Sequence, residues 1–152
     1  ANGLPPVAAQ QTVVLRAPTV VVASGDVSDG VQKYKGPETP IEVTIGSGSG
    51  AFMGFRQIDL TGISAVTFGA LAPEPQLNAI GGKVEVRRDS ATGPLLGETE
   101  MIRPNPTMAP PTQLRARLTP STGTYDLFFV FRNADAPAGR NLFILTTATF
   151  EH

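Results

Sequence analysis

The sequence has no cysteine and no tryptophan, and its only histidine is the last residue, His152. Without thiols the chain cannot form disulfides, thiolate metal sites or a cysteine nucleophile. A Ser-His-Asp triad and a multi-histidine metal site both need imidazoles within the folded chain, so these two classes of site are excluded as well. No apolar run approaches the roughly 18 residues of a membrane-spanning helix.

Excess charge of either sign is also lacking. The chain has 12 basic and 13 acidic residues, which gives a net charge of −1. Nucleic acids and anionic membranes recruit proteins through a strong positive field, and this chain has none to offer. We therefore expect no nucleic-acid partner and no membrane partner.

What is abundant is glycine and proline. The 152 residues include 16 glycines and 14 prolines, which separate short runs rich in β-branched residues. This pattern is typical of an all-β fold, here a two-sheet antiparallel β-sandwich, and the length suits a single domain. We expect residues 1–11 to be a linker remnant and 12–152 to form the sandwich. With no signal peptide and no initial Met, the chain is expected to be a mature protein or a module of a longer one.

Ten segments are predicted to be strands. The segment 125–132 is apolar on both faces and is expected to lie in the middle of a sheet. In the segment 51–59 alternation favours Phe52 as a core residue. The glycine-serine segment 46–50 is interpreted as a featureless surface loop. The predicted strands are 12–16, 19–23, 41–45, 51–59, 64–71, 83–88, 95–101, 113–118, 125–132 and 141–150.

Three segments in the second half resemble a known family. They are 84–97, 123–131 and 141–150, with the sequences VEVRRDSATGPLLG, GTYDLFFVF and NLFILTTATF. Together they resemble the strands and turns of family 6 carbohydrate-binding modules, and a looser similarity extends back to about residue 20. The resemblance implies a β-jelly roll that binds sugar at the loops of one end, on a concave sheet face, or at both.

The resemblance also implies candidate ligand-binding residues. In this family two aromatic side chains clamp a sugar ring, and an Asn before the last strand binds a hydroxyl. Tyr34 lies about where one aromatic is expected, and Asn141 matches the Asn. The family's Trp is replaced by a proline-rich loop that includes Arg103 and Asn105. Without the resemblance, Tyr34 is interpreted as a half-buried loop aromatic and Asn141 as a turn residue capping the last strand.

A structural calcium is a further implication of the resemblance. The family holds it with carboxylates after an N-terminal Ala and near the last strand. The corresponding residues here are Ser24 and Thr146, with Asp26 and Asp29 nearby. Calcium prefers six to eight oxygens with several carboxylates among them. Ser24, Asp26 and Thr146 are the candidate ligands.

The function implied is that of a non-catalytic carbohydrate-binding module. It would bind a polysaccharide or oligosaccharide and be tethered to catalytic or other domains of a larger secreted, periplasmic or cell-surface bacterial protein. The alternative is a structural or protein-interaction module that has lost the sugar site. Glu98 and Glu100 share a strand face, but nothing marks them as a glycosidase pair, so we expect no enzyme.

Four arginines have two interpretations. On one sheet face they would suit an acidic polysaccharide; interleaved with Glu85 and Glu98 they would form an ordinary solvated surface. These residues are Arg87, Arg115, Arg117 and Arg132.

Overall fold

The fold is a sandwich of two antiparallel sheets, as expected from the sequence. The computed structural model describes residues 19–35, 41–73, 78–104, 112–137 and 140–151. The predicted linker, 1–11, and the predicted strand 12–16 lie outside these ranges. The elements are β1 (Thr19–Val21), the 3₁₀ helix η2 (Val22–Ser24), β2 (Val27–Asp29), β3 (Val31–Tyr34), β4 (Val43–Gly46), β5 (Phe52–Asp59), β6 (Ala65–Leu71), β7 (Lys83–Arg88), β8 (Leu95–Glu98), β9 (Thr112–Arg117), β10 (Thr124–Arg132) and β11 (Ile144–Glu151).

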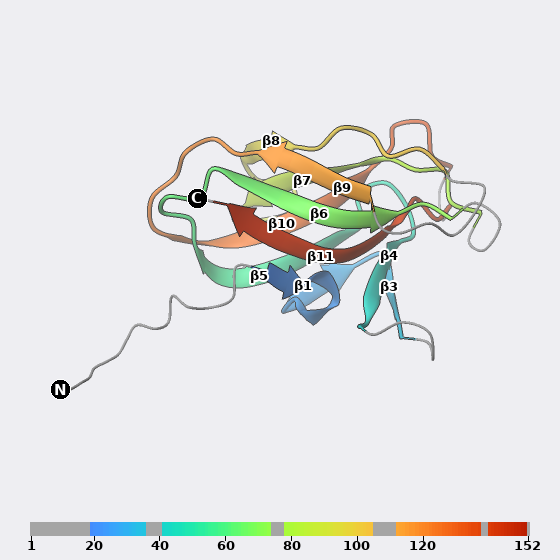
Figure 1. Cartoon of the computed structure of the whole chain (residues 1–152), viewed down its shortest axis with the longest axis horizontal. Coiled ribbons are helices and arrows are strands. Elements are labelled where there is room, and N and C mark those ends of the chain that lie inside the picture. Colours follow the sequence, from blue (N-terminus) through green and yellow to red (C-terminus); the bar gives the residue numbers. More distant parts are fainter. Residues whose placement is uncertain (1–18, 36–40, 74–77, 105–111, 138–139, 152) are drawn as a thin grey trace.

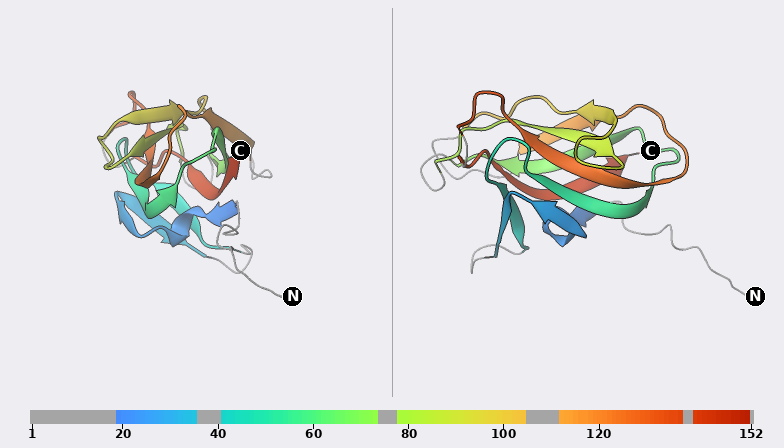
Figure 2. Two further views of the ribbon diagram at one scale, coloured as in Figure 1. Left: turned by 90° about the vertical axis from the view of Figure 1, so that its left-hand side faces the viewer. Right: turned by 180° about the vertical axis from the view of Figure 1, so that it is seen from behind.

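Figure 1 shows the two layers of the sandwich, with β6, β9 and β11 at the front. The first sheet, sheet A, has the order β3-β4-β11-β6-β9, and β1 also pairs with β11. The second, sheet B, has the order β2-β5-β10-β7-β8. The view from behind in Figure 2 brings β5 and β10 of sheet B to the front. No helix in the described part of the chain is long and apolar enough to cross a membrane.

The core lies between the sheets and is built from alternating positions of their strands. β10 is central in sheet B, as its two apolar faces predict, with β5 on one side and β7 on the other. Its inward residues Leu127, Phe129 and Phe131 are fully buried. The Phe129 ring lies edge-on to Phe68 of β6, with ring centroids 4.8 Å apart. Such aromatic contacts join the two sheets across the core.

The expectation for Phe52 was wrong. Met53 and Phe55 of β5 are the core residues, whereas Phe52 is only half-buried. Phe52 instead lies on the outer face of sheet B, where its ring contacts Phe128 edge-on at 5.6 Å. A register shift between β5 and β10, next to Gln57 at φ 54°, changes which residues of β5 face inward. Alternation alone could not reveal this irregularity.

Candidate functional site

Tyr34 lies on a strand, not in a loop. It ends β3, the edge strand of sheet A, and faces Val43 of β4 in the register. Its side chain is 54% exposed, the largest exposure among the large hydrophobic residues described. Gln32 lies two positions earlier and so projects from the same face of the strand, about 7 Å away along it. An aromatic ring and an amide are thus presented side by side to solvent.

A chain of polar side chains connects this strand to Asn141. The Gln32 side-chain amide donates a hydrogen bond to the Ser47 hydroxyl at 3.2 Å. The Ser47 hydroxyl in turn donates to Oδ1 of Asn141, also at 3.2 Å. Ser47 directly follows β4, and Asn141 precedes β11. Asn141 lies beside Gly46, at the opposite end of the β3–β4 pair from Tyr34, and the polar chain that reaches it begins at Gln32, two residues from Tyr34.

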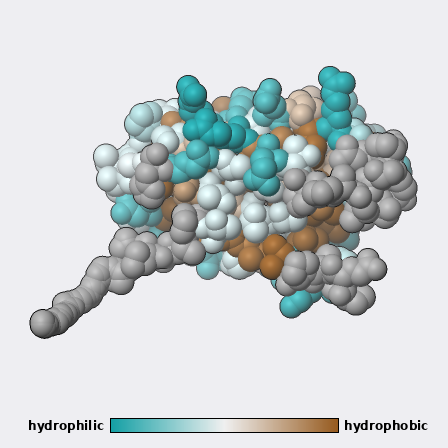
Figure 3. All heavy atoms as spheres, in the orientation of Figure 1, coloured by the Kyte–Doolittle hydropathy of each residue, from teal (hydrophilic) through white to brown (hydrophobic). Residues whose placement is uncertain are grey.

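An apolar strip runs across the outer face of sheet A beside this polar chain. Gln32 pairs with Ile45, Ile45 with Ile144, and Ile144 with Leu71 in the sheet register. Val43, the partner of Tyr34, belongs to the same cluster of apolar side chains. In Figure 3 a brown hydrophobic patch marks this side of the molecule, next to a pale surface. The candidate site thus combines an exposed ring, aliphatic side chains and a fixed polar edge.

The glycine-serine loop, expected to be featureless, has a defined role. Ser47 carries the hydrogen bonds described above, and the Ser49 hydroxyl accepts one from the backbone N–H of Asn133 at 3.0 Å. An open depression of about 490 Å³ lies beside the loop, and Ser47 is in its lining. The other lining residues are Asp29, Gly30, Gly48, Ser49, Gly50, Ala51, Ala136 and Pro137. Ser47 therefore links the depression to Gln32 and Asn141.

Gln32 and Ser47 were missed in the sequence analysis. For Gln32 a signal existed, because residues two apart on a strand share a face. For Ser47 the sequence gives no such signal. Its partner Asn141 lies 94 positions away, and the two meet only because β4 and β11 are neighbours in sheet A.

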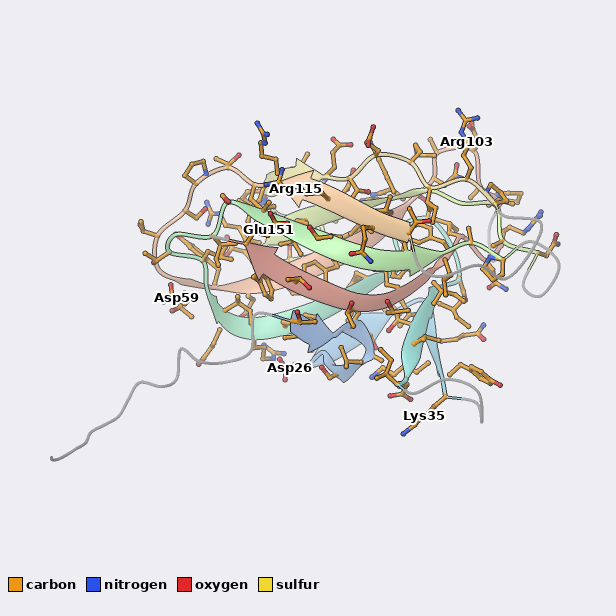
Figure 4. All side chains as sticks on the ribbon, in the orientation of Figure 1. Asp26, Lys35, Asp59, Arg103, Arg115 and Glu151 are labelled. Atoms are coloured by element: carbon orange, nitrogen blue, oxygen red, sulfur yellow. The ribbon has the colours of Figure 1, made fainter. Side chains whose placement is uncertain are left out.

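Arg103, another predicted ligand-binding residue, is not joined to this group. Figure 4 shows Arg103 at the upper edge of the molecule and Lys35, the neighbour of Tyr34, at the lower edge. Arg103 directly follows Ile102, which forms a bridge with Gly82. Asn105 lies outside the described residues, so its predicted role stays a prediction.

The four arginines lie on two different sheets. β7 and β10 carry Arg87 and Arg132 in sheet B, whereas β9 carries Arg115 and Arg117 in sheet A. A single basic face for an acidic polysaccharide is therefore not formed. Of the two interpretations of these arginines, the single basic face is wrong, because β9 pairs with β6 and not with a strand of sheet B.

On sheet B the two arginines share one acceptor. Nε of Arg87 and Nε of Arg132 each donate to Oε1 of Glu85 at 3.0 Å. Burial raises the pKa of Glu85, but the hydrogen bonds from Arg132 and Arg87 outweigh it and hold that pKa below its ordinary value. The group is therefore a structural ion-pair cluster whose carboxylate stays ionised.

On sheet A, Arg115 pairs with Glu151, and Figure 4 shows the two side chains together on the front sheet. Thr67 also donates to Glu151, and the hydrogen bonds from Thr67 and Arg115 lower the pKa of this carboxyl. Glu98 is exposed and pairs with Lys83 across two neighbouring strands. A glycosidase acid needs a carboxyl whose pKa is raised in an enclosed site. The pKa values of Glu85 and Glu151 are instead lowered.

The three candidate calcium ligands make hydrogen bonds to three different segments. The Ser24 hydroxyl donates to the carbonyl of Val21, within its own turn, at 2.6 Å. Asp26 accepts from the backbone of β5, and Thr146 donates to the backbone of β6. No group of three His, Cys, Asp or Glu side chains suited to a metal ion occurs among the residues described.

Many of the solved structures with this fold are family 6 carbohydrate-binding modules. Several match with TM-scores of 0.65 to 0.73. A family 6 module from Clostridium cellulolyticum in complex with xylose has a TM-score of 0.73 and 21% identity; the match covers 88% of this chain and 96% of that one. No protein-family model matches the chain, and no curated protein matches it in sequence. The likeness shows the fold.

Two further structures add context. A family 43 arabinoxylan arabinofuranohydrolase from Bacillus subtilis, in complex with cellotetraose, matches 88% of this chain with 27% of its own, at a TM-score of 0.71 and 21% identity. A family 36 module in complex with calcium and xylotriose matches at a TM-score of 0.61 and 13% identity, over 88% of this chain and 98% of that one.

The residues of this chain do not fit a calcium ion at the predicted position. Calcium takes six to eight oxygens, and carboxylates supply most of the neutralising charge. Ser24 and Thr146 offer neutral hydroxyls, and Asp26 offers the one carboxylate of the three. The two hydroxyls donate to the carbonyls of Val21 and Gly69, and Oδ2 of Asp26 accepts from the N–H of Arg56, so the three side chains are directed at different segments.

Proposed function

We propose that this chain is a non-catalytic carbohydrate-binding module that binds a polysaccharide or oligosaccharide. The observation that carries the proposal is the exposed Tyr34 ring on the same strand face as Gln32, where a chain of hydrogen bonds through Ser47 to Asn141 begins. A sugar ring has an apolar C–H face and a rim of hydroxyls. A flat ring next to fixed polar groups is complementary to both.

In this proposal one sugar ring stacks on Tyr34, and hydroxyls along the glycan contact the polar chain that begins at Gln32. Hydrogen bonding within the chain fixes the amide and hydroxyl orientations before the ligand arrives, so less freedom is lost on binding. Val43, Ile45 and Ile144 are 6–8% exposed and pack beneath this surface, so Tyr34 supplies the apolar contact. A single exposed ring and an open depression favour weak binding.

The comparisons support a sugar as the ligand. Modules with this fold are described in complex with xylose, cellobiose and cellotriose. The hydrolase match, which spans 27% of that enzyme, supports a module tethered to a catalytic domain. The parent protein in this proposal is a secreted one. In this arrangement residues 1–11 are a linker and 12–152 the module. Tethering would raise the local concentration of the substrate for the partner domain.

The proposal is tested by affinity electrophoresis of the chain in gels containing neutral or acidic polysaccharides. We expect a neutral glycan to retard the wild type and Tyr34→Ala to migrate as if no glycan were present. Leu95→Ala is the matched control, because Leu95 is also an exposed apolar residue but lies on β8 of sheet B. Equal retardation of Tyr34→Ala and wild type would rule out stacking on Tyr34. No retardation in any gel would favour a structural or protein-interaction module.

A further inference from the structure

The segment that joins sheet A to sheet B near the N-terminus is held by its own hydrogen bonds. It runs through η2 to Asp26. The Ser24 hydroxyl donates to the carbonyl of Val21 at 2.6 Å, and the N–H of Gly25 donates to the carbonyl of Val22 at 3.2 Å. These two bonds close the turn from within, because they satisfy the carbonyls of Val21 and Val22.

Asp26 binds the segment to sheet B through both its backbone N–H and its side-chain carboxylate. Its N–H donates to the carbonyl of Gly54 at 2.8 Å. Its carboxylate accepts from the N–H of Arg56, also at 2.8 Å. Both partners lie on β5, which is the neighbour of β2 in sheet B. The carboxylate is thus directed at a strand backbone, and a charge-assisted bond of this kind is among the stronger ones.

The segment is also held by packing, because its apolar residues are buried in the core. Val22 is fully buried and Ala23 is 3% exposed. A Cβ placed on Gly25 would come within 2.6 Å of the Met53 sulfur, so the backbone lies directly on the core. The turn is therefore packed as well as hydrogen-bonded.

Thr146 is turned away from this segment. Its hydroxyl donates to the carbonyl of Gly69 on β6 at 3.1 Å, beside the register shift in β11. β6 pairs with one edge of β11, whereas β1 and β4 pair with the other. η2 directly follows β1 and so lies at the edge of β11 that pairs with β1. The Thr146 hydroxyl bonds to β6, at the other edge of β11.

We infer that this chain holds its N-terminal segment in place without calcium at Ser24, Asp26 and Thr146. The set includes one carboxylate where calcium needs several. One oxygen of that carboxylate accepts from the backbone of β5, and the two hydroxyls donate to separate stretches of backbone. A buried oxygen without a hydrogen-bond partner among the described residues is Thr44 Oγ1, a neutral hydroxyl on β4. The Thr44 hydroxyl would add no negative charge to the three candidate calcium ligands.

The test is a comparison of thermal unfolding in EDTA and in about 1 mM calcium chloride. A site with a dissociation constant near 10 µM would raise the Tm by about 5–10 °C under these conditions. We expect the Tm to differ by less than about 1 °C between the two buffers. A calcium-dependent rise that Ser24→Ala and Thr146→Val both abolish would overturn the inference.

The two variants also distinguish a hydrogen bond from a metal ligand. We expect Ser24→Ala and Thr146→Val each to lower the Tm by about 2–4 °C, by the same amount in EDTA and in calcium. Isothermal titration of calcium chloride into the chain measures binding directly. Binding heat that is lost in both variants would contradict the inference, and heat that is absent or equal in all three proteins would support it.

Discussion

The Ser47 hydroxyl donates a 3.2 Å hydrogen bond to Oδ1 of Asn141, and this bond joins the loop after β4 to the segment before β11. The same hydroxyl accepts from Gln32, so one small side chain sets the positions of two amides. Backbone hydrogen bonds hold the surrounding chain, since the N–H of Ser47 donates to the carbonyl of Gly30 at 3.0 Å. The polar edge of the proposed sugar site is therefore fixed by the fold.

Removing this hydroxyl should weaken sugar binding without unfolding the chain. We expect Ser47→Ala to reduce the affinity for the neutral glycan about three- to tenfold, because two amides lose their common partner. Asn141→Ala should cost at least as much, since it removes the proposed hydrogen bond to the sugar itself. Titration calorimetry measures both. Ser90→Ala, in a turn of sheet B, is the control and should bind as the wild type does.

Gly46→Ala should destabilise the fold beneath the site. A Cβ at this position would overlap the ring of Phe131, which is fully buried. Overpacking of this kind costs about 1–3 kcal/mol, measured as the free energy of unfolding in urea. The double variant Gly46→Ala/Phe131→Leu should be less destabilised than the sum of the two single changes. Simple additivity would show that the two residues do not compete for space.

Thr44→Val should stabilise the protein. Thr44 is fully buried, and its hydroxyl has no hydrogen-bond partner among the described residues. Replacing that hydroxyl with a methyl group of similar size removes the cost of burying it, about 1 kcal/mol. The free energy of unfolding should rise by this amount, equally with calcium or EDTA. A lower free energy of unfolding in Thr44→Val would show that the hydroxyl has a partner. A larger loss in calcium than in EDTA would identify that partner as calcium.

Glu85→Gln should lower the free energy of unfolding by about 1 kcal/mol at neutral pH, because Arg87 and Arg132 lose their shared negative partner. In the wild type the pKa of Glu85 is lower in the folded chain than in the unfolded one. The folded chain therefore binds fewer protons there, so this stability is present above the unfolded pKa and is lost as pH falls. We expect the loss between about pH 5 and pH 3.

The Glu85→Gln variant should lose less stability over that pH range than the wild type, measured by urea unfolding at several pH values. Glu98→Gln is the matched control, since Glu98 is exposed and pairs with one lysine. Its effect should stay within about 0.5 kcal/mol. Equal pH dependence in wild type and Glu85→Gln would show that Glu85 contributes nothing to it.

The sequence predicted the architecture because most of its strands repeat hydrophobic residues at the period of a sheet. β7 occupies the predicted residues 83–88, and β10 differs from its predicted range by one residue. The two strands that it missed, β2 and β3, are short and largely exposed. The sequence Gln-Lys-Tyr of β3 has little apolar alternation, so local pattern could not separate an edge strand from a loop.

The candidate site was less predictable than the fold. The resemblance to a family predicts Tyr34 and Asn141 as site residues. For Ser47 the glycine-serine composition of its segment predicts a featureless loop. Its role depends on a contact across 94 positions, which no local pattern encodes. The register shift beside Gln57 cannot be predicted from local pattern either, because a bulge depends on how the partner strand pairs.

The most direct test of the proposed sugar site is calorimetric titration of wild type, Tyr34→Phe and Tyr34→Ala with the neutral oligosaccharide selected by the gel screen. Tyr34→Phe keeps the ring and Tyr34→Ala removes it, while thermal unfolding checks that all three fold alike. We expect Tyr34→Phe to bind within about threefold of the wild type and Tyr34→Ala to bind at least about tenfold more weakly. Equal affinity in all three proteins would contradict a sugar site at Tyr34.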